Sequence, residues 1–152
     1  MKNRLLALIS KGMIAILTVA FGGLAAAQMT PLGGWYSVDD KTGEVKSLVV
    51  ISEKDGVLTG RIDKLLRQNA DQNAVCKACT DDRKDQRMLG LEIIRGAKKA
   101  EGQDVWEGGK ILDPENGKDY TLRLTPVEGG KKLEVRGSIL FFSRTQTWQR
   151  AQ

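Results

Sequence analysis

From residue 33 onward the chain consists of short runs in which apolar and polar residues alternate, separated by turn sequences. In residues 120–125, for example, Tyr120, Leu122 and Leu124 alternate with polar residues. Alternation with a period of two is typical of a strand that buries one face. The pattern predicts eight strands, at residues 34–38, 44–52, 57–66, 89–98, 105–112, 120–125, 132–140 and 143–149. A helical interpretation of residues 88–94 stays open.

The turns between these strands favour a meander of hairpins. Asp55-Gly56 and Asn116-Gly117 are dipeptides that suit tight hairpin turns. Many short strands joined by hairpins predict an all-β fold, a small antiparallel up-and-down barrel, with a sandwich as the alternative. Gly60 and the pair Gly108-Gly109 lie inside predicted strands, where glycine permits the sharp bends that a small barrel needs.

One long segment, residues 67–87, breaks this pattern because it is polar, has no period and holds both cysteines. Segments of this length without regular structure are uncommon in compact domains, so we expect a functional loop or a short helix. Cys76 and Cys79 have three interpretations: a disulfide that pins the loop, a thioredoxin-type redox pair, or half of a zinc site. The redox pair needs a βαβ setting, and the zinc site needs two further soft ligands. The disulfide is therefore favoured, provided that the compartment is oxidising.

The first 27 residues have the organisation of an export signal. Lys2, Arg4 and Lys11 precede or open an apolar run at residues 13–21, and three alanines end at Ala27. This order predicts a signal peptide over residues 1–27, cleaved to leave one domain of residues 28–152 in the periplasm or outside the cell. A retained anchor is the alternative, but the 15 residues from Met13 to Ala27 fall short of the roughly 20 that span a bilayer. We expect no membrane span after cleavage.

Charge and composition then narrow the function. Three of the 24 basic residues and none of the 19 acidic residues lie in residues 1–27, so the remainder has a net charge of +2. That charge is too weak to favour nucleic-acid binding. The chain contains no histidine, the commonest general base and metal ligand. We therefore expect no metal, no cofactor and no enzymatic activity, and rank thiol-disulfide or carboxylate catalysis last.

Acidic residues gather at one turn, where Asp113, Glu115, Asn116 and Asp119 offer several oxygens. Their spacing does not match that of a calcium-binding loop. Turn stabilisation is the favoured interpretation.

Three segments resemble a family of short exported bacterial proteins, catalogued as domain of unknown function 2147. They are Gly33-Gly34-Trp35 with residues 39–43, residues 106–114 with 116–118, and residues 135–137 with 144–148. The Cys76-x-x-Cys79 pair is also similar to that of the family. Together these motifs span nearly the whole predicted mature chain. The resemblance implies a fold similar to the lipocalins and fatty-acid-binding proteins, and it implies no established activity.

The Gly33-x-Trp35 element also resembles the opening signature of lipocalins. In that group the Trp closes the barrel floor, and a basic side chain from near the end of the last strand packs across it. The resemblance implies that Arg144 or Arg150 takes this role, by stacking a guanidinium plane on an indole, with Trp148 beside it in the closure. A simple core position for Trp35 is the alternative.

These observations predict a non-enzymatic barrel that binds a small apolar or amphipathic molecule. By analogy with fatty-acid-binding proteins, an inward arginine would pair with the head group of the ligand. The candidate ligand-binding residues are Trp35, Trp106, Tyr120, Arg136 and Arg144. The alternatives are a barrel filled by its own side chains and a cell-envelope module that binds another protein through its outer surface or its Cys-bearing loop. A monomer is assumed.

Overall fold

The computed structural model describes residues 29–152. The predicted export signal, residues 1–27, lies outside the described residues. All eight predicted strands are present, with ends that differ from the predicted ones by a few residues. They are β1 (Gly33–Val38), β2 (Val45–Lys54), β3 (Val57–Leu65), β4 (Glu92–Lys99), β5 (Trp106–Asp113), β6 (Lys118–Val127), β7 (Lys132–Ile139) and β8 (Phe142–Arg150), with a short 3-10 turn, η1 (Glu128–Gly130), before β7.

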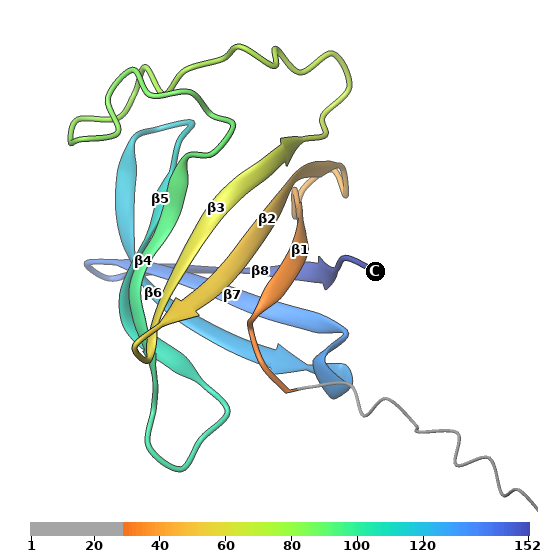
Figure 1. The fold of residues 1–152 in the computed structure, drawn as a ribbon, viewed down its shortest axis with the longest axis vertical. Helices are drawn as coiled ribbons and strands as arrows, with labels where there is room; N and C mark the ends of the chain where they lie inside the picture. The colour runs from red at the N-terminus through yellow and green to blue at the C-terminus, as the bar shows by residue number, and fades with distance from the viewer. Residues whose placement is uncertain (1–28) are drawn as a thin grey trace, which may run out of the picture.

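Each strand pairs with the next one along the chain, and β1 pairs with β8 to close a barrel (Figure 1). Every pairing is antiparallel. The predicted up-and-down barrel is therefore confirmed, and the sandwich alternative is wrong. Closure removes the two unpaired edges that an open sheet of this length would expose.

The helical interpretation of residues 88–94 is wrong, because residues from Glu92 onward form β4. Gly60 pairs with Ile94 and Arg61 pairs with Glu92, so Ile93 is an extra residue in a β-bulge. The bulge buries Ile93 and Ile94 in succession and breaks the alternation of the strand. The resulting apolar spacing imitates that of a helix.

Glycines allow strands to approach each other closely, as the sequence predicts. A Cβ on Gly109 would lie 2.4 Å from the backbone nitrogen of Ala97 in the adjacent strand. Its neighbour Gly108 has φ +77° and lies where the pairing of β5 with β6 slips by one residue. A side chain at either position would push β4 and β5 apart or strain the bulge.

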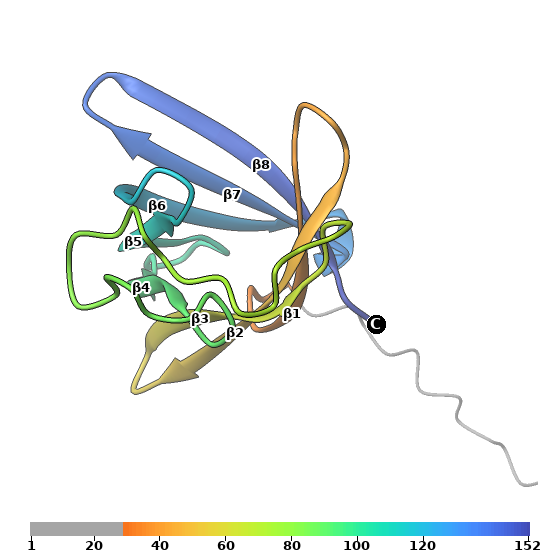
Figure 2. The same ribbon diagram turned by 90° about the horizontal axis from the view of Figure 1, so that it is seen from above.

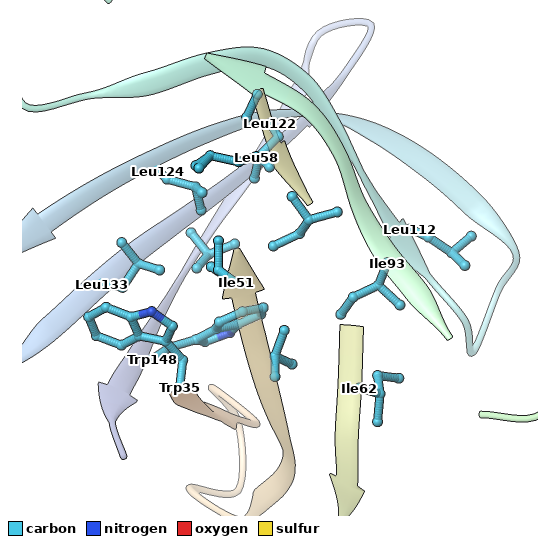
Figure 3. Packing of buried hydrophobic residues seen from close by; sticks show 14 of the residues in the cluster. Trp35, Ile51, Leu58, Ile62, Ile93, Leu112, Leu122, Leu124, Leu133 and Trp148 are labelled. Atoms are coloured by element: carbon cyan, nitrogen blue, oxygen red, sulfur yellow. The ribbon is translucent and has the colours of Figure 1, made fainter. Parts of the chain in front are cut away.

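The two ends of the barrel differ. One end carries the start of β1, the end of β8 and the β2–β3, β4–β5 and β6–β7 connections, and we call it the closed end. The other end carries the remaining four connections, including the long loop of residues 66–91, and we call it the open end (Figures 1 and 2). Large buried side chains such as Leu58, Leu124 and Leu133 fill the closed half (Figure 3).

Candidate ligand-binding cavity

A cavity of about 590 Å³ occupies the open half of the barrel. Its deeper wall is apolar, whereas its mouth is lined by charged and polar side chains. The apolar wall includes Ile62, Ile93, Leu112, Val135 and Trp148. The open half of the barrel is therefore not filled by its own side chains.

The cavity exists because the inward-facing residues change from large and apolar to small and polar toward the open end of the strands. Trp35 and Val49 lie in the core, but the next inward positions toward the open end are Ser37 and Ser47. The two serine hydroxyls lie 2.7 Å apart and share a hydrogen bond inside the barrel. Small side chains paired with each other leave space that larger apolar residues would fill.

The closed end has a floor built on Trp35. The guanidinium carbon of Arg150 lies 4.1 Å from the centroid of the Trp35 ring, a stacked cation–π contact. Arg150 also donates hydrogen bonds to the carbonyls of Thr30 (2.7 Å) and Leu32 (2.9 Å) and of Gly130. The indole Nε1 of Trp35 donates to the Pro31 carbonyl at 2.7 Å. This network ties the first residues of the barrel to the last.

Two other predicted closure residues also lie at this end. Gly33 has φ +102°, and a Cβ there would lie 3.4 Å from a guanidinium nitrogen of Arg150. Trp148 is buried beside Trp35 (Figure 3) and also lines the cavity. Trp148 therefore stands between the floor and the cavity.

Arg144, in contrast, lies at the mouth. Its Nε donates to Asp40 Oδ2 at 2.7 Å, and it lines the cavity. Of the two arginines considered for the position over Trp35, Arg150 therefore takes it and Arg144 does not. The reason is register, since β1 pairs with β8 so that Trp35 lies opposite Arg150.

A second group of charges at the mouth centres on Glu115. Lys46 Nζ lies 3.0 Å and Arg67 Nη1 lies 2.8 Å from its Oε1. Burial by itself would raise the pKa of Glu115, but the hydrogen bond and charge of Lys46, with the charge of Arg67, lower it below its usual value. Arg67 Nε is buried and has no hydrogen-bond partner among the described residues, with Glu44 Oε2 4.0 Å away.

The remaining predicted ligand-binding residues divide into two groups. Tyr120 lines the cavity with Arg144. Trp106 is buried with Lys99 Nζ 5.2 Å from its ring centroid, and does not line the cavity. Arg136 is exposed and donates to Ser143 Oγ at 2.8 Å. It falls between the inward residues Val135 and Gly137, so the pleat of β7 directs it outward. Trp35, Trp106 and Arg136 therefore lie outside the cavity.

Several polar residues of the cavity were not predicted from the sequence. Strand parity alone identifies three of them, because each lies two residues from a buried Trp or Val of the same strand. These are Ser37, Ser47 and Gln146. Lys46 and Arg67 gave no such signal, because they reach the mouth from the edge of the barrel.

The loop of residues 66–91 forms part of the cavity wall. The predicted disulfide between Cys76 and Cys79 is present, and both cysteines are buried. The short helix considered for this loop is absent, and residues 66–91 consist of turns with one bridge between Val75 and Arg87. The loop is therefore held by local contacts and not by regular structure.

Arg83 is the main anchor of this loop. Its side chain is 5% exposed and pairs with Asp81 (2.6 Å) and Asp119 (2.7 Å), and it donates to the Glu92 carbonyl. Hydrogen bonds from Arg83 lower the pKa of Asp81 to about 2. Because Asp119 lies in β6, this cluster joins the loop to the barrel wall.

Of the acids at the β5–β6 turn, Asp113 acts within the turn, whereas Glu115 and Asp119 pair with basic residues outside it. Asp113 accepts hydrogen bonds from the Glu115 backbone N–H (2.9 Å) and from Asn116 Nδ2 (3.0 Å). Across residues 29–152, no three Cys, Asp or Glu side chains are arranged to hold a metal ion. The same residues contain no helix long and apolar enough to cross a bilayer.

The closed barrel coincides with a known family domain. A family model described as an uncharacterized protein conserved in bacteria, DUF2147, matches residues 33–150. The chain belongs to the DUF2147 family. The match begins with the first residue of β1 and ends with the last residue of β8, so in this chain the DUF2147 domain is the barrel itself.

A solved structure supports the fold of this DUF2147 domain. The protein HP1028 from Helicobacter pylori, described as belonging to the lipocalin family, superposes with a TM-score of 0.67 at 19% sequence identity. The alignment covers 80% of this chain and 82% of that one. At this identity the likeness shows a lipocalin-like barrel and nothing about activity. No curated protein matches this chain in sequence.

Proposed function

We propose that this protein is exported and that its barrel binds a small amphipathic molecule, with the apolar part of the ligand deep in the cavity and an acidic head group at the mouth. The observation that carries the proposal is the open cavity of about 590 Å³. That volume lies within the range of small-molecule sites, roughly 300–1,000 Å³. The floor of Trp35 and Arg150 closes one end, so a ligand enters from the other.

The lining supports an amphipathic ligand over a wholly apolar one. Ile93, Leu112 and Val135 offer an apolar wall to a hydrocarbon chain, and burial of such a chain is favourable. At the mouth, Lys46 and Arg67 both form ion pairs with Glu115. Both cations line the cavity, and a carboxylate or phosphate oxygen is the ligand group that suits such a pair.

The charge pattern supports binding over catalysis. The two mouth acids with shifted pKa values, Asp39 and Glu115, have pKa values below the usual range. Asp39 is held down by the backbone N–H groups of Thr42 and Lys41. A general acid or base near neutral pH needs a raised carboxyl pKa, so these groups suit a role in binding.

Displacement of a fluorescent fatty-acid analogue from residues 28–152 tests the proposal. Ser47→Phe places a large ring in the cavity, and we expect it to weaken binding at least roughly tenfold. Thr147→Phe adds the same ring at an exposed position of β8 and is the matched control, expected to bind as the unchanged protein does. Failure of fatty acids, fatty alcohols and lysophospholipids to displace the probe, with nothing co-purified in native mass spectrometry, would refute the proposal.

The head-group assignment has its own test. Arg67→Gln should weaken binding of a fatty acid but leave binding of the alcohol of the same chain length unchanged, because only the acid presents a charge to the mouth. Lys110→Gln removes a cation of the outer face, where Lys110 contacts Thr121, and serves as control. Equal effects of Arg67→Gln on acid and alcohol would contradict an acidic head group.

Export is tested by the mass of the protein in its native compartment. Cleavage after Ala27 predicts a mature chain that begins at Gln28 and is recovered from the periplasm or the medium. Recovery of the intact chain from the membrane fraction would instead indicate a retained anchor.

A further inference from the structure

The tip of the β7–β8 hairpin is apolar and exposed. Ile139, Leu140, Phe141 and Phe142 are 37%, 89%, 100% and 76% exposed, respectively. The hairpin extends away from the barrel axis (Figure 2) and lies at the open end, where the cavity has its mouth. A cluster of large apolar side chains that protrudes into water is typical of a surface that binds a partner.

The turn sequence at this tip differs from those of the other hairpins. The β2–β3 and β5–β6 connections use Asp55-Gly56 and Asn116-Gly117, as turns normally do. Here Leu140 occupies a positive φ of 52°, where Gly, Asn or Asp is favoured. Leucine is unfavourable in this backbone conformation. The stability of the turn therefore does not explain why an apolar side chain is present here.

Basic residues flank the tip without nearby acids in its own strands. The twelve residues from Val135 to Gln146 contain Arg136 and Arg144 and no Asp or Glu. Arg136 is exposed on the outer face, beside Arg123 of the neighbouring strand. Arg144 pairs with Asp40 across the mouth. Arg136 forms no ion pair among the described residues, and an apolar tip beside such a cation is complementary to a layer of apolar chains beneath anionic phosphates.

We propose that the β7–β8 tip inserts into the surface of a membrane that contains anionic phospholipid. A narrow two-residue turn offers far less area than the roughly 800 Å² per partner of a stable protein interface. It does fit between lipid head groups, where leucine and phenylalanine reach the acyl region and Arg136 meets phosphates.

The test uses residues 28–152, which contain every strand of the closed barrel and its floor and so form a complete folding unit. Flotation with vesicles of phosphatidylcholine plus phosphatidylglycerol should recover the protein, and phosphatidylcholine alone should recover less. Leu140→Gly with Phe141→Ser should reduce the bound fraction at least roughly tenfold. This change supplies turn residues that suit the backbone, so the thermal midpoint should be kept or raised. Val50→Ser, at an exposed valine of β2, is the matched control and should bind normally.

Two further variants separate the contribution of charge at the tip from that of ligand binding in the cavity. Arg136→Gln should reduce binding only to the vesicles that contain phosphatidylglycerol. Ser47→Phe should leave vesicle binding unchanged, so loss of ligand binding and loss of membrane binding remain distinguishable. The proposal fails if the unchanged protein does not float with either vesicle, or if the tip variant floats equally well. A tip-dependent dimer in sedimentation, without vesicle binding, would overturn it in favour of a second copy of the chain.

Discussion

At the scale of single residues, Arg150 connects parts of the chain that are far apart in sequence. Its guanidinium stacks on Trp35 and donates to carbonyls near the start of the barrel and to Gly130 before β7. Burial lowers the pKa of Arg150, yet arginine stays charged because its ordinary pKa is so high. A planar group with several fixed donors meets these demands together.

Lysine cannot replace Arg150 for this reason. Arg150→Lys keeps the positive charge but loses the stacking plane and most of the donors, and leaves buried carbonyls unpaired. We expect the free energy of unfolding to fall by about 1–3 kcal/mol, measured by urea denaturation followed by tryptophan fluorescence. Arg123→Lys, in an exposed pair with Glu107, should change it by less than about 0.5 kcal/mol. Equal effects of the two changes would show that the floor contributes no special stability.

Strand parity limits how far such residues can be assigned from sequence. Arg144 and Arg150 both have even residue numbers in the last strand, as does the buried Trp148, so alternation alone cannot choose between them. The choice depends on the register of β8 against β1, which joins the two ends of the chain. A pairing between strands so distant in sequence leaves no local signal.

At the scale of elements, the strands and the position of the long loop were predictable, whereas the internal structure of the loop was not. Period-two patterning and turn dipeptides located every strand, although the alternation breaks at β-bulges such as those at Ile93 in β4 and Gly108 in β5. Residues 66–91 have no period, because their order comes from Arg83, the disulfide and a close contact with the β5–β6 turn. Contacts of this kind are scattered in sequence and leave no repeating pattern.

The contact between the loop and the β5–β6 turn makes Gly117 a sensitive position. A Cβ on Gly117 would overlap the carbonyl of Ala78 between the two cysteines, and Gly117 also has φ +72°. Gly43 has a similar φ of +74° with nothing within 4 Å of its Cβ position. Gly43→Ala should therefore lower stability only by the backbone strain, about 1–2 kcal/mol. Gly117→Ala should lower stability by the same strain and should also displace the loop of residues 66–91 from the β5–β6 turn.

Limited proteolysis separates these two effects. At equal fractions of folded protein, the Gly117→Ala variant should be cut within residues 66–91 several times faster than the Gly43→Ala variant, because local opening exposes the loop. Unfolding in urea measures the global loss in each variant. Identical cleavage of the two would mean that the loop is not held by the turn.

At the scale of the whole molecule, the barrel is packed at one end and open at the other. The alternation of apolar and polar residues predicted a barrel, but an empty volume depends on how many inward positions are small and how the strands are staggered. Ser37 and Ser47 were the one indication in the sequence, since each lies two residues from a buried neighbour and so faces inward with a small side chain. The distinction between a filled and an open interior therefore required the three-dimensional arrangement.

This division predicts that stability and ligand affinity can be changed independently. Arg150→Lys at the closed end should lower the free energy of unfolding and leave fatty-acid affinity within about twofold, because the cavity lies beyond Trp148. Arg67→Gln at the mouth should weaken affinity and change the unfolding free energy of the unliganded protein little. In the double variant, the changes in unfolding free energy and the changes in binding free energy should each equal the sum of those in the single variants to within about 0.5 kcal/mol.

Saturating ligand should then stabilise the Arg150→Lys variant as much as the unchanged protein, since the gain depends only on ligand concentration and dissociation constant. A loss of affinity in Arg150→Lys as large as that in Arg67→Gln would instead show that the floor shapes the cavity, and that the two ends act as one unit.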